Sequence, residues 1–186
     1  MTSTHHAMPA GPMQLSDGRR VWFRPIHPDD VHRLREFHRR LSMDTQRLRF
    51  FTPLRELSQA MAENFCNVDH DKRTAIVVTY PGEDAIRGVG RLEDMGDGTA
   101  EVAFVLEDQL QGNGLGKALL RLLAAHARER GIGRLTAVVL PENGAMLHLF
   151  RTCEFPSTFE IRDGNEYITL DISEPHAPRP LVAGAA

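Results

Sequence analysis

The spacing of hydrophobic residues changes along the chain, and each change marks a different kind of predicted element. From Thr74 onward apolar and polar residues alternate, which predicts three strands at residues 75–80, 86–92 and 101–106. Turn sequences rich in glycine separate these strands, so they are expected to form an antiparallel meander. An earlier strand is predicted at residues 21–26.

Helical spacing precedes the meander. The first predicted helix is marked by four apolar residues three or four positions apart: Val31, Leu34, Phe37 and Leu41. Asp29 or Asp30 is expected to cap this helix. Two short helices are predicted at residues 47–51 and 57–65, and Ser58 is a suitable cap for the second. The first helix is expected to cover a face of the sheet.

After the meander the spacing is helical again over residues 117–130, and Gly131 suits the left-handed position beyond a helix end. The remaining predicted elements are a strand at residues 135–140, a short helix at 143–151 and a hairpin of strands at 158–161 and 166–172. A strand–helix–strand crossover is usually right-handed and joins parallel strands. The predicted fold class is therefore α/β, in the sense of an α+β mixed sheet: mostly antiparallel, with one βαβ crossover and helices on both faces.

A glycine-rich loop, Gln111-Gly112-Asn113-Gly114-Leu115-Gly116, lies between the strand at 101–106 and the helix at 117–130. Glycine has no Cβ and tolerates positive φ, so the loop can curl with its N–H groups close to a ligand. The helix that follows directs unpaired N–H groups and the positive end of its dipole at the same place. This arrangement predicts a phosphate or pyrophosphate site, although many glycine-rich turns bind nothing.

Two familiar nucleotide motifs do not fit this loop. A Walker loop requires Ser or Thr after Gly-Lys, and Gly116-Lys117 is followed by Ala118. A dinucleotide fingerprint requires a glycine three positions after Gly116, where this chain has Leu119. The loop therefore predicts neither of these nucleotide sites.

Composition adds limits on partners and location. The 186 residues suit one domain, predicted at residues 16–172 between flexible tails at 1–15 and 173–186. A net charge of -3 gives no bulk basicity for nucleic acid. No secretory signal and no stretch of 18 apolar residues is present, which predicts a cytoplasmic protein that does not enter a membrane. Cys66 and Cys153 lack metal-ligand spacing, so we predict reduced thiols and no metal site.

The loop, together with a second motif, resembles the GNAT (Gcn5-related) N-acetyltransferases. Residues 111–116 fit the family's Q/R-x-x-G-x-G/A motif at every defined position. The second motif, N-x-x-A-x-x-L-Y-x-x-x-G-F, has counterparts at Asn143, Met146, Leu149, Phe150 and Phe155. The resemblance covers about residues 16–172 and implies the GNAT fold. It also implies acetyl-CoA as co-substrate, with direct transfer of the acetyl group to an amine.

The resemblance also implies which residues bind acetyl-CoA. Backbone amides of the loop would contact the pyrophosphate: Gln111, Gly112, Asn113, Gly114 and Gly116, with Leu115 in the same loop. The strand before the loop would bind the thioester end through the backbone of Phe104, Val105 and Leu106. Asn143 would reach the pantetheine arm or nearby backbone.

Shorter strings, R-P-I at 24–26, R-F-F at 49–51 and A-E-V-A-F at 100–104, resemble the GNAT domain of bacterial Pat-type protein lysine acetyltransferases. Those enzymes acetylate acyl-CoA synthetases. This narrower resemblance implies that a protein with an exposed lysine is the acceptor. A monomer or homodimer is expected.

Glu101 is the predicted general base. A lysine amine, with a pKa near 10.4, must lose a proton before its nitrogen can attack a thioester. Glu101 lies on the strand before the loop and matches a glutamate that some protein-acetylating members of the family use. Its apolar neighbours, Val102, Ala103 and Phe104, are expected to give it surroundings that favour proton uptake. A plain strand-end glutamate beside the turn at 96–98 is the alternative.

Other acidic residues are given structural roles. Glu107 and Asp108 are expected in a solvated loop, since carboxylates beside a pyrophosphate would repel it. Asp69, His70 and Asp71 are expected to form a turn, although they could line an acceptor entrance.

The chain departs from the family pattern at two positions. Phe150 replaces the tyrosine that often protonates the leaving CoA thiolate. The CoA thiol has a pKa near that of cysteine, about 8.5, so it can leave unaided or with water. Glu154 replaces the usual glycine before Phe155. Three readings stay open: a protein lysine acetyltransferase, a small-molecule amine acetyltransferase, and a non-catalytic acyl-CoA-binding regulatory module.

Overall fold

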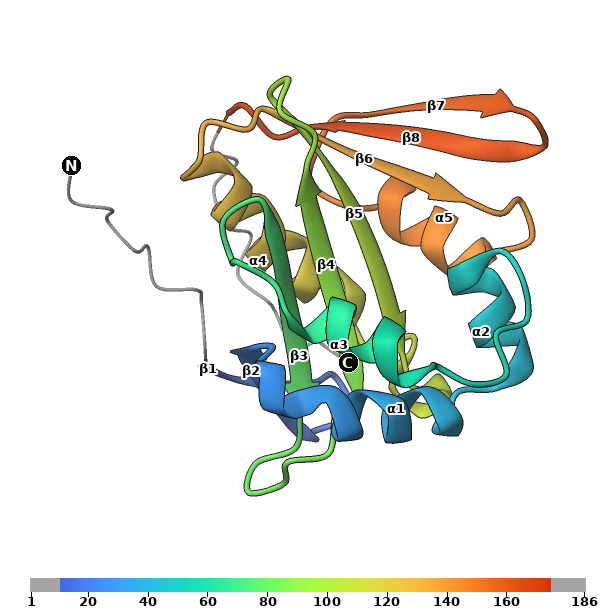
Figure 1. Ribbon diagram of the computed structural model, residues 1–186. Coiled ribbons are helices and arrows are strands. Elements are labelled where there is room, and N and C mark those ends of the chain that lie inside the picture. Colours follow the sequence, from blue (N-terminus) through green and yellow to red (C-terminus); the bar gives the residue numbers. More distant parts are fainter. Residues whose placement is uncertain (1–10, 175–186) are drawn as a thin grey trace.

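A computed structural model of the chain describes residues 11–174 (Figure 1). Its strands, in chain order, are β1 (Gly11–Gln14), β2 (Arg20–Pro25), β3 (Arg73–Thr79), β4 (Gly88–Asp94), β5 (Thr99–Leu106), β6 (Arg134–Val139), β7 (Ser157–Arg162) and β8 (Asn165–Asp171). Its helices are α1 (Val31–Arg40), α2 (Met43–Phe50), α3 (Gln59–Cys66), α4 (Leu115–Arg128) and α5 (Gly144–Arg151), with short 3-10 turns η1 (Pro28–Asp30) and η2 (Asp108–Leu110).

One sheet holds all these strands, in the order β1-β2-β3-β4-β5-β6-β8-β7. Among the strands of residues 11–174, only β5 and β6 pair in parallel, and α4 connects them (Figure 1). The other neighbours pair antiparallel, and β3, β4 and β5 form the predicted meander. The predicted mixed, mostly antiparallel sheet with one βαβ crossover is confirmed.

Two hydrophobic cores lie on opposite faces of the sheet, because side chains alternate along each strand. On one face α4 buries Leu119 and Leu123 against Val102 and Phe104 of β5. On the other face α1 and α3 pack over Val77 and Val89. Helices on both faces are therefore confirmed, and Figure 1 shows α1 and α3 on the side of the sheet opposite α4.

The structure differs from the sequence prediction at the N-terminal end of the fold. Residues 11–14 fall in the predicted tail, yet they form β1 and pair with β2 from Gly11↔Phe23 to Gln14↔Arg20. The turn after β1 brings the two strands side by side. The four residues of β1 show no hydrophobic alternation, so the sequence did not predict this strand. Of the predicted tails, residues 1–10 and 175–186 lie outside the described residues.

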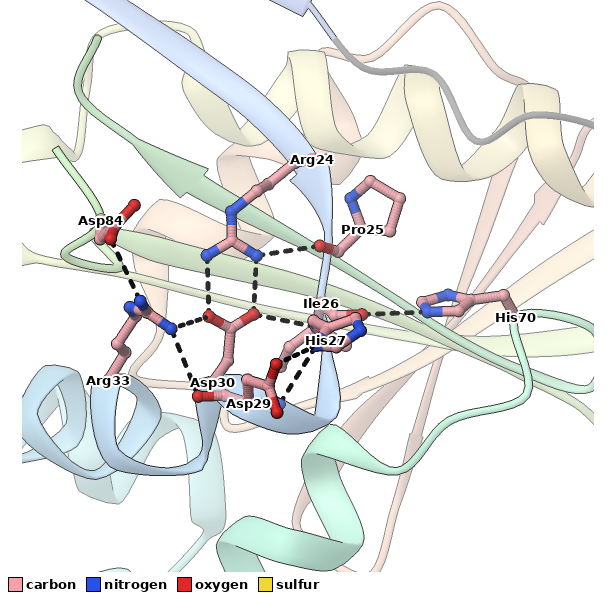
Figure 2. A network of polar contacts seen from close by, with 9 residues as sticks. All are labelled: Arg24, Pro25, Ile26, His27, Asp29, Asp30, Arg33, His70 and Asp84. Carbon is pink, nitrogen blue, oxygen red and sulfur yellow. Dashed lines mark hydrogen bonds and ion pairs between the residues drawn. The ribbon is translucent and has the colours of Figure 1, made fainter. Parts of the chain in front are cut away.

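A buried ion pair fixes the junction between β2 and α1 (Figure 2). The Asp30 side chain, in η1, is only 2% exposed and accepts hydrogen bonds from both Nη atoms of Arg24, at 2.6 and 2.8 Å. The same carboxylate accepts from the backbone N–H of His27 at 2.9 Å, which closes a capping box. Burial alone would raise the pKa of Asp30, but the hydrogen bonds from Arg24 and His27 outweigh it and lower that pKa. Asp30 occupies the predicted N-cap position of α1, but its side chain makes no capping hydrogen bond to that helix and instead joins β2 to η1.

A buried histidine links α4 to β3. His126 is 1% exposed, and its Nε2 lies 2.9 Å from Thr74 Oγ1. Burial, and then the nearby Arg130 guanidinium, lowers the pKa of His126 from 6.5 to about 4. The folded protein therefore holds this imidazole neutral at pH values where the unfolded chain would protonate it.

This lowered pKa predicts a loss of stability in mild acid. The contribution is complete above pH 6.5 and falls as the pH drops toward 4, because only the unfolded state gains the proton. Between pH 7 and 5 we expect about 2 kcal/mol of unfolding free energy to be lost through this group. Urea titrations across that range should give a flatter profile for His126→Gln than for the wild type. His32→Gln, at a side chain 84% exposed, is the matched control and should keep the wild-type slope.

Candidate functional site

A gap opens in the sheet between β5 and β6. The two strands pair only from Thr99↔Arg134 to Glu101↔Thr136, although β5 continues to Leu106 and β6 to Val139. Beyond Glu101 the strands no longer form a ladder. The gap therefore begins at Glu101 and extends toward the carboxyl ends of both strands, over about 17 Å of β5 if each residue rises about 3.3 Å.

The register of β5 decides which of its backbone groups face this gap. Met95 N–H donates to Thr99 C=O, and Glu107 N–H donates to Arg87 C=O, in the same β4–β5 register. Since backbone direction alternates along a strand, odd-numbered residues of β5 turn their polar groups toward β4. The even-numbered residues Val102, Phe104 and Leu106 turn theirs toward the gap. Of the three predicted backbone contacts, Phe104 and Leu106 face the gap, whereas Val105 faces β4.

The glycine-rich loop stands at the open end of the gap. Gly112 and Gly114 have φ of 77° and 79°, a conformation that side chains with a Cβ rarely adopt. Gly114 is the N-cap of α4, and the helix's hydrogen bonding begins with Ala118 N–H donating to Gly114 C=O at 3.1 Å. The N–H groups of the preceding first turn thus have no helical acceptor and point toward the loop. The geometry of an anion-binding loop is present.

Gly116 has a different role from the other two glycines. It lies inside α4, and a Cβ built there would approach Leu149 Cδ1 of α5 to 2.4 Å. The absence of a side chain therefore lets α4 and α5 pack closely. The tolerance of glycine for positive φ is thus used at Gly112 and Gly114, whereas Gly116 is helical and is required for close packing.

The second motif places α5 beside the same opening. Asn143 follows β6 and caps α5, where its Oδ1 accepts from Met146 N–H at 3.1 Å. Because parallel strands end on the same edge of a sheet, Asn143 after β6 and the loop after β5 lie on the same edge. Phe150 is 1% exposed, and its ring lies 6.3 Å from that of Phe104. The phenylalanine at the family's tyrosine position is thus part of the core.

Helix α2 bridges the two sides of the opening. The Asp108 carboxylate in η2 accepts hydrogen bonds from Ser42 N–H and Oγ, at the N-terminus of α2. Further along α2, Arg47 Nη1 lies 3.5 Å from Glu142 Oε1 in the loop after β6. These contacts attach α2 to the loops that follow β5 and β6. Partial burial opposes the change, but hydrogen bonds from Thr45 and Ser42 lower the pKa of Asp108.

Glu101 lies at the closed end of the gap, far along β5 from the loop. Its side chain is exposed and lines a cavity of about 110 Å³ on the face that carries α1 and α3. Of its expected apolar neighbours, Val102 and Phe104 point to the opposite face of the sheet, and only Ala103 lines the cavity with Glu101. Directly across the ladder from Glu101 is Glu93, a second carboxylate in the same cavity.

Two other expectations for acidic residues have different outcomes. Glu107 is not in a solvated loop: its side chain is 5% exposed and lies 2.7 Å from Arg40 and 3.4 Å from Arg87. The arginines come from α1 and from the segment before β4, which sequence spacing could not bring together. The turn at 69–71 is confirmed, since Asp69 Oδ1 accepts from the N–H groups of Asp71 and Arg73.

The cavity beside Glu101 contains residues that the sequence analysis did not select. Three arginines line it: Arg49 of α2, Arg73 of β3 and Arg91 of β4. Across the sheet, the ladder aligns Arg73 with Glu93 and Glu93 with Glu101. Arg49 comes from the R-F-F string, which was noted for its resemblance and not for chemistry. The other two gave no signal, because only strand register brings them to the cavity.

Residues 11–174 include no helix of the length and hydrophobicity that a membrane span requires. In the same range, no three His, Cys, Asp or Glu side chains gather closely enough to suggest a metal site. Cys66 is buried and Cys153 half-buried, and both are free thiols as predicted. Burial raises the pKa of the Cys66 thiol to about 11, so it is protonated at neutral pH.

Comparisons with known proteins agree with this geometry. A family model described as an acetyltransferase (GNAT) domain matches residues 20–156. An acetyltransferase of Pseudomonas aeruginosa is 33% identical over 138 residues, which cover 73% of this chain and 74% of the relative. Acetyltransferase Pat of Mycolicibacterium smegmatis is 31% identical over 137 residues, covering 73% of this chain but 41% of that protein. This chain thus matches less than half of the mycobacterial relative.

Among solved structures, the GNAT domain of S. lividans PAT superposes with a TM-score of 0.81 and 32% identity. The match covers 92% of this chain and 99% of that chain. The similarity therefore concerns the whole folded unit and not the glycine-rich loop alone.

Proposed function

The chain belongs to the GNAT family of acetyltransferases, and on this basis we propose that it moves the acetyl group of acetyl-CoA directly to a primary amine. A protein lysine is the leading acceptor, with an acyl-CoA synthetase as the first protein to test. One observation carries the proposal: the anion-binding loop and Glu101 stand at the two ends of the same gap in the sheet. A long thioester can be bound at one end and react at the other.

The pyrophosphate of acetyl-CoA binds at the loop in this proposal. Amides of Gln111, Gly112, Asn113, Gly114 and Gly116 donate to it, with Leu115 at the start of α4. No side-chain charge is required, because free N–H groups and the helix dipole both favour an anion. The nearby carboxylates of Glu107 and Asp108 are already engaged by Arg40, Arg87, Ser42 and Thr45. Their repulsion of the pyrophosphate is therefore reduced.

The pantetheine arm extends along the gap toward Glu101. The backbone of Leu106 and Phe104 faces this path, and Val102 is the next gap-facing residue before the strands pair. The amide groups of pantetheine can pair with these strand groups as an added strand would. Asn143, whose Oδ1 is occupied at the α5 cap, acts by holding the loop after β6 beside the arm.

The chemistry begins with the acceptor amine. Glu101 takes a proton from the ammonium group, directly or through water, and the neutral nitrogen attacks the thioester carbonyl carbon. The C–S bond then breaks, CoA leaves as thiolate, and the nitrogen loses a second proton to the thiolate or to solvent. A gap-facing N–H of β5 stabilises the oxyanion formed in between.

Phe150 leaves the thiolate without the family's usual tyrosine donor. Its ring is enclosed beside Phe104 and offers no proton. A thiol pKa of about 8.5 makes thiolate a moderate leaving group, so transfer can proceed with water as the only proton source. The missing donor also motivates a second candidate, a module that binds acyl-CoA without catalysis.

The test uses labelled acetyl-CoA. The protein is incubated with a purified acyl-CoA synthetase in one reaction and with a panel of free amines in another, and label transfer and CoA release are measured. We expect label on a lysine of the synthetase. Label on free amines alone would favour the small-molecule enzyme. Binding of acetyl-CoA without transfer to any acceptor would leave only the non-catalytic module.

A further inference from the structure

The cavity beside Glu101 is lined by side chains of both charges. Besides the three arginines, Glu93 and Glu101 line it, and apolar walls come from Phe65 of α3 and Ala103 of β5. At about 110 Å³ it is well above the roughly 10–15 Å³ that one water molecule needs. A smaller cavity of about 30 Å³ adjoins it, and Arg49, Phe65, Arg91 and Ala103 line both.

None of these three arginines has a carboxylate partner among the described residues, and Arg73 donates instead to Asn64, at 3.3 Å to its Oδ1 and 3.0 Å to its C=O. In the part of the chain that is described, neither Arg49 nor Arg91 makes an ion pair, whereas Arg24, Arg40 and Arg87 do. Arg91 donates to Phe65 C=O at 2.7 Å and lies over the Phe65 ring, 4.6 Å from its centroid. A guanidinium has five N–H donors, so most of its donors remain available.

The surroundings of these two side chains favour an incoming anion. Burial, and then the positive charge of Arg49, lowers the pKa of Arg91 to about 10. Burial also lowers the pKa of Arg49, and the charge of Glu101 opposes that change. Both guanidiniums are thus partly buried and close to each other. Burial and mutual repulsion cost free energy, and a bound anion would offset that cost.

A buried histidine lines the smaller cavity. His38 of α1 is 2% exposed, and neither of its ring nitrogens has a hydrogen-bond partner. It shares this cavity with Arg49 and Arg91. Burial lowers the pKa of His38, which keeps one N–H and one bare nitrogen on the ring at neutral pH. The two adjoining cavities therefore contain a carboxylate, Glu101, and three groups that can donate hydrogen bonds: Arg49, Arg91 and His38.

We propose that Arg49 and Arg91 select acceptors that carry a carboxylate close to the reacting amine. The inference rests on the proposed function and names its substrate class. Three arginines and two glutamates give the larger cavity one excess positive charge, which would repel a bare ammonium group. An acceptor with its own carboxylate enters without that penalty. Its amine lies at Glu101, and its carboxylate lies between the two guanidiniums.

Two sources can supply this chemistry. One is a protein lysine with Asp or Glu beside it, and the other is a free amino acid. Both present an amine and a carboxylate on one short chain, and bidentate pairing with a guanidinium suits either. The structure assigns the specificity to the carboxylate. Which source is used can be determined with one series of peptide acceptors and one series of small amines.

The test compares matched acceptors that differ only in the carboxylate. The first series is a capped peptide with a Glu-Lys pair and the same peptide with Gln-Lys. The second is 6-aminohexanoate and hexylamine. We expect kcat/KM for the carboxylate-bearing member to exceed that of its partner by about tenfold to a hundredfold, the range that one or two charge-assisted hydrogen bonds give. The series that reacts identifies the source.

Arginine variants link this preference to the cavity. Arg49→Gln and Arg91→Gln should each reduce the ratio of kcat/KM within a reactive pair by about tenfold, mainly through KM for the carboxylate member. Arg49→Lys, which keeps the charge but loses the planar fork, should retain part of the ratio. Arg55→Gln is the control, because Arg55 is exposed and lines neither cavity. Acetyl-CoA binding by each variant verifies that it is folded.

The outcomes separate this inference from the function on which it rests. Equal use of both members of every reactive pair by the wild type would overturn the carboxylate selection and leave acetyl transfer intact. Preference for the carboxylate that survives both Gln variants would also overturn the assignment to Arg49 and Arg91. If no amine is acetylated at all, the proposed function itself fails.

Discussion

Replacing Glu101 by Gln is expected to lower kcat for acetyl transfer by about 10²–10⁴-fold, the usual contribution of a general base. Gln has the same shape but cannot take the proton that the acceptor must lose. The residue is the last on β5 to pair with β6, so it stands where the gap closes and where a thioester bound along the gap must end. Steady-state kinetics should show a large loss of kcat. A binding titration should show nearly unchanged affinity for acetyl-CoA.

Glu93→Gln is the matched control for Glu101→Gln. Glu93 lies directly opposite on β4, lines the same cavity and carries the same charge, but it is one strand farther from the gap. It should keep most of the activity. Only Glu101→Gln should show the large loss of kcat. Activity of Glu101→Gln close to the wild type would exclude this residue as the base.

The loop variant Gly114→Val should show the opposite kinetic pattern. A β-branched residue is strained at a φ of 79°, so the loop would lose the shape that presents its N–H groups. We expect weaker acetyl-CoA binding and a raised KM for acetyl-CoA, with a smaller change in kcat. The contrast between the two variants separates cofactor binding at the open end of the gap from proton transfer at the closed end.

The parts of the site that sequence could predict are local in the chain. The loop, the short helix at 143–151 and the crossover from β5 through α4 to β6 each depend on short-range signals such as glycine spacing and a change of hydrophobic period. These signals depend on residues close together in the chain, and the folded structure keeps the local conformations that they favour. The end of β5 and the start of α4 could therefore be located before the structure was known.

What sequence could not predict depends on register and on distant partners. Arg91 reaches the cavity because β4 pairs with β5 in a register that aligns it with Ala103, next to the Glu93↔Glu101 pair. The ion pair between Glu107 and Arg40 joins residues 67 positions apart. The surroundings of Glu101 were misjudged for the same reason. Neighbours in sequence alternate between faces of a strand, so the apolar residues beside Glu101 in the chain lie on the other side of the sheet.

These long-range contacts give the two faces of β5 different tasks. The face toward α4 is apolar and fixes the strand in the core. The face toward α1 and α3 changes from Val105 through Ala103 to Glu101, and so from covered and apolar to open and charged. In the proposed enzyme the acceptor approaches along this face, while acetyl-CoA lies in the gap at the strand's edge. The acceptor and acetyl-CoA then meet at Glu101, because this residue lies both beside the gap and on the charged face of β5.

The position of α1 over that face makes Asp30 the residue whose loss should most affect stability. Asp30→Ala is expected to lower the free energy of unfolding by about 3–5 kcal/mol, the range for breaking a buried ion pair from one side. The change leaves the Arg24 guanidinium without its carboxylate and the His27 N–H without its acceptor (Figure 2). Urea denaturation followed by circular dichroism measures the difference between variant and wild type.

Asp29→Ala is the control for this prediction, because the Asp29 side chain is 83% exposed and belongs to the same turn. It should cost about 0.5 kcal/mol or less, as exposed substitutions usually do. Asp30→Asn keeps one acceptor for His27 but not the charge that pairs with Arg24, so its stability should fall between the two. An equal effect of Asp29→Ala and Asp30→Ala would show that the turn tolerates loss of the ion pair.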